Sequence, residues 1–172
     1  ATLIELVKNA PPNVDLLAAF TVQEEVGLRG ARVAAYTLEP DLAFVVDCTP
    51  AYDLPTWDEE ENVRYNTKLG EGPAIYVADS ATLSDPRLIR HLKATAKRAG
   101  IPYQVRQPGG GGTDAGAIHR QRAGIPSVSM SVPGRYLHTA ASIARIEDWR
   151  NLLALIHTAL SHLDNDILST DH

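Results

Sequence analysis

The segment from Phe20 to Ala31 holds the residues best suited to chemistry. An apolar run ending at Val22 stops at two adjacent carboxylates, Glu24 and Glu25, and glycines follow at 27 and 30. This strand–turn–helix pattern places charged groups at the carboxyl edge of a sheet, where open α/β sheets bind ligands. Two neighbouring carboxylates repel each other, so both stay ionised when a cation lies between them. The alternative is a solvated acidic loop, because charged residues are mostly exposed.

Polar side chains also follow three other predicted strands. They are Asp47 after the apolar run 42–46, Thr113 and Asp114 after a strand at 103–106, and Arg135 and His138 after a strand at 127–132. If the strands are parallel, these groups reach the same edge of the sheet. Carboxylates and an imidazole are ligands for a zinc-like ion, and a carboxylate that does not bind the metal can act as a general base. Alternatively, Asp47 is a cap or turn residue, and His138 is structural or simply exposed.

Strands and helices alternate along the chain. Strands are predicted at 15–22, 42–46, 74–78, 103–106 and 127–132, and helices at 2–9, 31–37, 86–99, 115–122 and 146–163. Continuous apolar strands indicate burial on both faces, as in a sheet covered by helices. The pattern predicts a three-layer α/β/α sandwich with a mostly parallel sheet. One domain spans residues 1–163, and the polar tail at 164–172 is expected to fray.

The composition excludes several classes of function. The chain has 172 residues and a net charge of −5 with acids and bases interspersed, which argues against nucleic acid or an anionic membrane surface as a partner. No apolar run is long enough to span a bilayer. The single cysteine, Cys48, allows no internal disulfide, and a reducing cytoplasm is the default location. Cys48 is expected to be a buried small apolar group.

Three long motifs resemble one peptidase family. They are Val22–Ala31 (VQEEVGLRGA), Gly111–His119 (GGTDAGAIH) and Pro133–His138 (PGRYLH), and the segments at 69–75 and 100–104 are also similar. The family comprises the dinuclear-metal glutamyl and deblocking aminopeptidases, which form tetrahedral particles of the TET type and include relatives labelled endoglucanase. The resemblance runs from end to end and implies a zinc-peptidase-like fold.

The resemblance also implies roles for particular residues. Glu24 corresponds to the general base, which takes the proton from the attacking water. Glu25 and His138 correspond to ligands of one metal ion, and Asp47 to a ligand of the other; zinc or cobalt would be the metal, with two ions in a complete site. The substrate would be a short peptide that loses its amino-terminal residue. Substrate contacts or scaffolding are expected of Arg135, Tyr136, Thr113 and Asp114.

The chain departs from the family pattern at its start. Ala1 already lies in a helical pattern without a capping residue, and a histidine ligand, a bridging aspartate and an inserted dimerisation domain have no counterpart. The chain is therefore expected to be the C-terminal part of a catalytic domain, at best a weak binder of one metal ion, and weakly active or inactive alone. It would form a homo-oligomer or associate with a missing N-terminal half. The alternative is a non-catalytic subunit for structure or assembly.

A second alternative is nucleotide binding. Residues 110–115 fit the dinucleotide fingerprint G-x-G-x-x-A between a predicted strand and a predicted helix. The acid that would bind the ribose should lie near 131–135, and that segment contains none.

Overall fold

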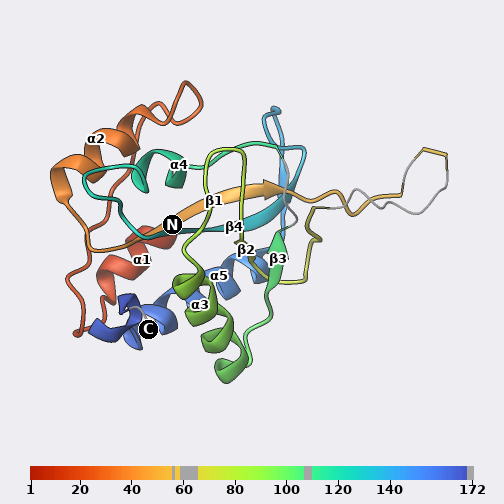
Figure 1. Cartoon of the computed structure of the whole chain (residues 1–172). Helices are drawn as coiled ribbons and strands as arrows, with labels where there is room; N and C mark the ends of the chain where they lie inside the picture. The colour runs from red at the N-terminus through yellow and green to blue at the C-terminus, as the bar shows by residue number, and fades with distance from the viewer. Residues whose placement is uncertain (56, 59–65, 107–109, 170–172) are drawn as a thin grey trace.

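The computed structural model describes residues 1–55, 57–58, 66–106 and 110–169. Its helices are α1 (Thr2–Lys8), α2 (Arg29–Leu38), α3 (Pro86–Ala99), α4 (Ala115–Ile118), α5 (Ile146–Ser161) and the 3₁₀ helix η1 (Asn165–Leu168). Its strands are β1 (Ala43–Pro50), β2 (Ala74–Tyr76), β3 (Gln104–Arg106), β4 (Ser127–Arg135) and β5 (Ile143–Ala144). Figure 1 shows their arrangement.

The sheet has the order β1-β4-β2-β3, with β5 paired to the end of β4. The predicted α/β class is confirmed, but the sheet is mixed rather than mostly parallel. β1 is parallel to β4, and β2 is parallel to β3, while β2 and β4 are antiparallel. The described residues between β1 and β2 contain no crossover helix. β2 therefore starts from the end of the sheet at which β1 finishes, and it runs back.

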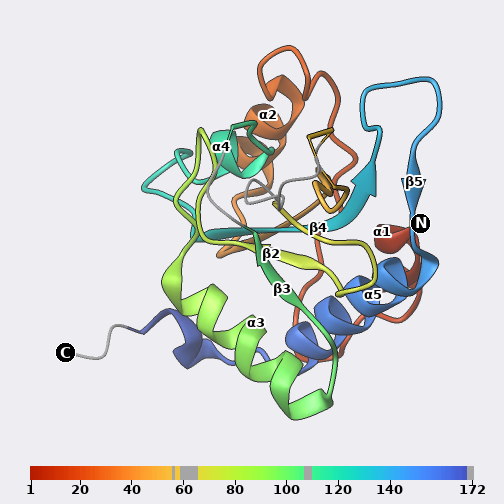
Figure 2. The same ribbon diagram turned by 90° about the vertical axis from the view of Figure 1, so that its right-hand side faces the viewer.

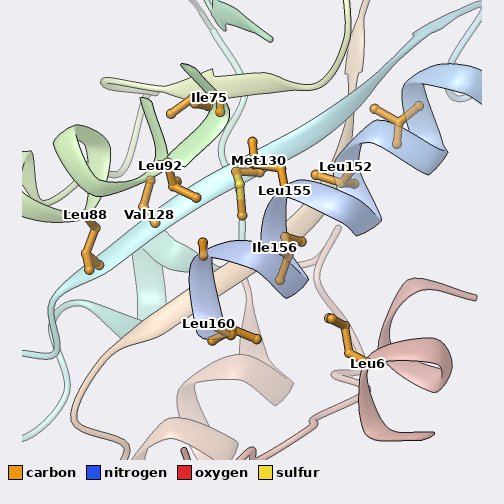
Figure 3. Packing of buried hydrophobic residues seen from close by; sticks show 13 residues of the cluster. Leu6, Ile75, Leu88, Leu92, Val128, Met130, Leu152, Leu155, Ile156 and Leu160 are labelled. Carbon is orange, nitrogen blue, oxygen red and sulfur yellow. The ribbon is translucent and has the colours of Figure 1, made fainter. Parts of the chain in front are cut away.

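Helices cover both faces of the sheet and give the three predicted layers. Figure 2 shows α3 and α5 on one face and α2 with α4 on the other. The main core lies on the α3–α5 face, where side chains from the two helices meet those of β4 and β2 (Figure 3). Eight of the nine residues of β4 are buried, because β4 is central in the sheet and covered on both faces.

The ends of α3 follow their sequence signals. Asp85 caps the helix by accepting a hydrogen bond from the Arg87 main-chain N–H (2.8 Å), and Pro86 occupies the first helical position. Gly100 follows the helix with φ 65°, in the left-handed region that suits glycine. These signals are local, so the sequence predicts both ends of α3 correctly.

The segment 15–22 is the clearest departure from the prediction. It forms no strand, because no described segment forms a β-ladder with it. Several of its apolar side chains are exposed, Leu17 to 52%, Phe20 to 70% and Val22 to 66%, whereas Leu16 packs partly against the core. The apolar run predicts a buried strand, but a strand also needs a neighbour to satisfy its main-chain groups.

Two smaller predictions are also wrong. Cys48 is exposed rather than buried. It lies near the end of β1, an edge strand, beyond Phe44 and Val46, which share its face of the strand and pack against the core. The tail does not fray at its start, because Ile167 and Leu168 of η1 pack against the core cluster.

No helix among the described residues has the length and apolar character needed to cross a membrane.

Candidate active site

A tight turn presents Glu24 and Glu25 ahead of α2. The main-chain N–H groups of Gly27 and Leu28 both donate to the Glu24 carbonyl oxygen, at 3.1 and 2.9 Å. Gly30 then donates to the Val22 carbonyl at 2.9 Å. A Cβ atom at Gly30 would overlap the Val22 main chain, so glycine is required there. The sequence thus fixes this turn locally, with its two carboxylates side by side.

Asp47 lies within β1, beside Ser131 of β4. Its carboxylate accepts a hydrogen bond from the Cys48 main-chain N–H at 2.7 Å. Burial raises the pKa of Asp47, and repulsion from Asp114 and Glu25 adds to this rise, while the Cys48 hydrogen bond and His138 oppose it. The ionised form of Asp47 is therefore less favourable here than in water.

Thr113 and Asp114 arrive from the loop that precedes α4. Thr113 is 1% exposed; its hydroxyl lies 2.7 Å from the Ser129 hydroxyl and donates to Asp79 at 3.3 Å. Asp114 accepts a hydrogen bond from the Thr21 hydroxyl, and its other oxygen, Oδ1, is buried with no hydrogen-bond partner among the described residues. Thr113 therefore anchors the loop, and Asp114 is the member of the pair that reaches the other carboxylates.

Arg135 is the last residue of β4, and His138 follows the strand. His138 Nδ1 lies 3.3 Å from Glu25 Oε1, and both side chains are mostly exposed. Arg135 Nε donates to Asp53 at 2.7 Å. Burial alone would raise the pKa of Asp53, but hydrogen bonds from Arg135 and the Leu69 main chain outweigh it and lower that pKa. Arg135 is thus held by a carboxylate, whereas the Tyr136 side chain is 54% exposed.

These segments converge on Glu24. Burial raises the pKa of Glu24, and Asp47, Glu25 and Asp114 raise it further by repulsion, with His138 opposing them. A carboxylate with a raised pKa is a stronger base, which is the property that general-base catalysis uses. The convergence does not require a parallel sheet. β3 runs antiparallel to β4, yet Asp114 is bound by the Thr21 hydroxyl and lies within electrostatic reach of Glu24.

Residues 1–155 match the family model of the M42 glutamyl aminopeptidases. The chain belongs to this family. The matched range includes the glycine-rich segment 110–115, so the dinucleotide reading loses its support.

Similar proteins have the same enzyme class in their names. The glutamyl aminopeptidase of Lactococcus lactis subsp. cremoris is 35% identical over 164 residues, which cover 95% of this chain and 44% of that protein. An aminopeptidase from the archaeon Desulfurococcus kamchatkensis is 31% identical with a TM-score of 0.89, covering 99% of this chain and 48% of that one. The TET1 peptidase of Pyrococcus horikoshii, described as assembling into a tetrahedron or a large octahedral shell, is 34% identical with a TM-score of 0.68 over 84% of this chain and 40% of that one. The chain spans less than half the length of these relatives.

Peptidases of the M42 family are generally dependent on divalent metals. The donor types around Glu24 suit such an ion, but a zinc site normally has at least three protein ligands. Within the described ranges, no group of three or more His, Cys, Asp or Glu side chains is arranged to hold a metal ion. The closest approach is the pair formed by Glu25 and His138. The described residues therefore do not complete a metal site by themselves.

The sequence analysis did not identify Arg106, which supports the site. Arg106 is 4% exposed and lies 4.5 Å from the centre of the Tyr76 ring. Its guanidinium donates to the Thr49 hydroxyl (3.2 Å) and the Gly110 carbonyl (2.8 Å). It therefore ties β1, which carries Asp47, to the loop that carries Asp114. No local signal marks this role, because each contact joins segments far apart in the sequence.

Proposed function

We propose that this chain forms part of a metal-dependent aminopeptidase that removes amino-terminal residues from short peptides, with Glu24 as the general base. The observation that carries this proposal is the placement of Glu24 among the carboxylates of Asp47, Glu25 and Asp114. Burial raises the pKa of Glu24, and repulsion from these carboxylates raises it further. Membership of the M42 family supports the reaction class. Glu24 would accept the proton of the water that attacks the first peptide bond.

The other site residues take roles around Glu24. Glu25, Asp47 and His138 are proposed as metal ligands in a protein whose remaining part supplies further ligands, with two zinc or cobalt ions in the complete site. Asp114 and Tyr136 are proposed to contact substrate directly. Thr113 and Arg135, held by hydrogen bonds to Ser129 and Asp53, would act through the loops that they position. Residues 1–163 would then be the C-terminal part of the catalytic domain.

The alternative is a non-catalytic subunit for structure or assembly. The exposed apolar side chains of segment 15–22 favour it, since a segment without a partner in the sheet can pair with a strand of another chain. Assembly of the Pyrococcus horikoshii TET1 peptidase into shells makes a homo-oligomer a reasonable proposal for this protein too. A cytoplasmic location also stays a prediction, based on the single cysteine.

Calorimetric titration with Zn²⁺ and Co²⁺ tests the ligand assignment on the 172-residue chain. We expect at most one weak site, lost in His138→Ala and retained in His162→Ala, a histidine distant in sequence whose ring lies near its own helix carbonyl at Thr158. Strong binding of two ions by the chain alone would contradict the incomplete site. Retention of the weak site in His138→Ala would contradict the ligand role.

The general base is tested in a protein expressed with the coding sequence that precedes Ala1. If that sequence supplies a His-x-Asp motif and a bridging aspartate, Glu24→Gln should lower turnover of a leucyl or glutamyl p-nitroanilide by about 10²–10⁴-fold. Metal content should stay unchanged. Glu71→Gln, on an exposed loop, is the matched control. Full turnover in Glu24→Gln would overturn the proposal, and an upstream sequence without those ligands would favour the assembly subunit.

A further inference from the structure

A hollow lies between α2 and α4, beside the acidic turn. Its volume is about 400 Å³, and its lining consists of Gly27, Leu28, Arg32, Ala117, Arg120 and Gln121. The two helices lie side by side in both views (Figures 1 and 2). Pockets that bind small molecules have volumes of about 300–1,000 Å³, so this hollow is large enough for a small ligand. We call it the Arg32–Arg120 hollow.

The charge of this lining is one-sided. It contains two guanidinium groups and no carboxylate. Neither Arg32 nor Arg120 forms an ion pair with any described residue, whereas Arg87, Arg122 and Arg135 each pair with a carboxylate. Two guanidinium groups that share a hollow repel each other, and an anion between them removes that repulsion. The lining therefore favours a negatively charged ligand.

Hydrogen bonds within α4 and the turn after it fix part of the lining. Arg120 Nε donates to the Gly116 carbonyl at 2.8 Å, which leaves the two Nη groups for a ligand. Gln121 Nε2 donates to the Ala117 carbonyl at 3.0 Å. A guanidinium held in one orientation loses less entropy when it binds a carboxylate in bidentate geometry.

The hollow lies close to the proposed base. Gly27 and Leu28, which form one wall, both donate to the Glu24 carbonyl, so the wall is one turn of chain from Glu24. The negative charge around Glu24 and the positive charge of the hollow therefore lie on adjoining segments of the chain. A short peptide carries the complementary charges at its two ends.

We propose that the Arg32–Arg120 hollow binds the terminal carboxylate of a short peptide whose amino end lies toward the acidic turn. This assignment rests on the proposed function for the direction of the peptide, but the carboxylate site itself does not require turnover. It restricts the substrate to short peptides with a free C-terminus, because a longer chain or a terminal amide presents no charge at this position.

The test uses ligands that lack an ammonium group, so that binding is independent of the acidic turn and of catalysis. N-acetyl-Ala-Ala is titrated calorimetrically into the 172-residue chain at low salt, beside its C-terminal amide. The third ligand is N-acetyl-glutamic acid with its α-carboxylate as the amide, so that only the side-chain carboxylate is free. We expect the free C-terminal acid to bind at least about tenfold more tightly than either, a difference of about 1.4 kcal/mol.

Arg32→Gln and Arg120→Gln should each weaken binding of the acid by about tenfold, and the double variant more. Both side chains are exposed, so the variants should fold normally, which circular dichroism checks. Arg90→Gln is the matched control, since it removes the same charge from an exposed position on α3. Its affinity should equal that of the parent chain.

Several results would overturn the assignment. Equal binding of the acid and the amide would show that the hollow does not recognise the carboxylate. An equal loss of affinity in Arg90→Gln would show a general charge effect. Tighter binding of the side-chain carboxylate would assign the hollow to an acidic side chain instead. Competition by acetate at the same concentration would indicate an unspecific anion site. None of these measurements depends on Glu24 acting as the general base. The carboxylate site and the proposed function are therefore tested independently.

Discussion

The two faces of the sheet differ in how their side chains are satisfied. On the α3–α5 face, Leu88, Leu92 and Leu155 are fully buried. On the α2–α4 face, Val33 and Tyr36 of α2 are 66% and 56% exposed, and the acidic turn beside them carries carboxylates that repel one another. Burial of apolar surface is the main source of folding free energy. Stability therefore resides on the first face, and the groups capable of chemistry on the second.

The polar groups of the two faces differ in the same way. Asp148 on α5 is fully buried and accepts hydrogen bonds from Gly70 and Gly72, and Asp85 is bound by Arg87. Glu24 and Asp47 instead have raised pKa values, because burial and neighbouring carboxylates disfavour their charge. Unfavourable charge that the fold retains is a common property of functional sites. Replacing a carboxylate should therefore destabilise the chain on the first face and stabilise it at the acidic turn.

The largest expected effect is the loss of a core side chain. Leu155→Ala removes a fully buried side chain from the α3–α5 face and should lower the free energy of unfolding by about 2–5 kcal/mol. Val33→Ala, on the exposed side of α2, should change it by less than about 0.5 kcal/mol. Urea unfolding followed by circular dichroism measures both. Equal losses would show that the two faces contribute alike and would end the comparison.

How much the sequence predicts also differs between the faces. The caps and apolar spacing of α3 and α5 are local signals, and both helices are found close to where the sequence places them. The strand predicted at 15–22 is wrong, since an apolar run does not reveal whether a neighbouring strand exists. The direction of β2, antiparallel to β4, also differs from the prediction, because the described residues between β1 and β2 form no crossover helix.

Sequence motifs name the proposed members of the candidate site, but not the residues that support them. Motifs and strand ends indicate Glu24, Asp47 and His138, and the structure brings these side chains within electrostatic reach of one another. The partners that fix them, such as Asp53 for Arg135, come from distant segments without a local pattern. Pairings of this kind depend on the folded chain, so sequence reasoning alone could not supply them.

The second prediction concerns the buried carboxylate of α5. Asp148→Ala leaves the main-chain N–H groups of Gly70 and Gly72 without their acceptor and should cost about 2–3 kcal/mol. Glu147→Ala is the matched control, since Glu147 is exposed and its approach to Arg145 is 3.8 Å, typical of a weak surface pair. Denaturant unfolding compares them. A loss below that of Glu147→Ala would show that Asp148 does not hold this loop to α5.

The third prediction is a pH dependence on the packed face. Hydrogen bonds from Arg87 lower the pKa of Asp85 below its ordinary value of 3.8, although burial opposes them. A lowered pKa stabilises the fold above the ordinary value, and this contribution is lost as pH falls through the lowered pKa. Asp85→Ala should therefore cost about 1 kcal/mol at neutral pH and progressively less below pH 3.8.

Unfolding midpoints in urea, measured between neutral and acidic pH, test this dependence. Asp15→Ala is a suitable control, because Asp15 is exposed on segment 15–22. A cost for Asp85→Ala that stays constant through the acidic range would contradict the role of its ionised form.

The smallest expected effect has the opposite sign and comes from the acidic turn. Burial and repulsion from Asp114 raise the pKa of Asp47 above its ordinary value of 3.8. For a raised pKa, the stabilising contribution is present below the ordinary value and is lost as pH rises through the raised one. At neutral pH in chelator, Asp47→Asn should therefore stabilise the chain, by up to about 1 kcal/mol, and the gain should vanish in acid. Asn keeps the shape of the side chain and removes only its charge. Destabilisation at neutral pH would therefore mean that the Asp47 carboxylate stabilises the fold. The contrast between the two faces would then no longer hold at this residue.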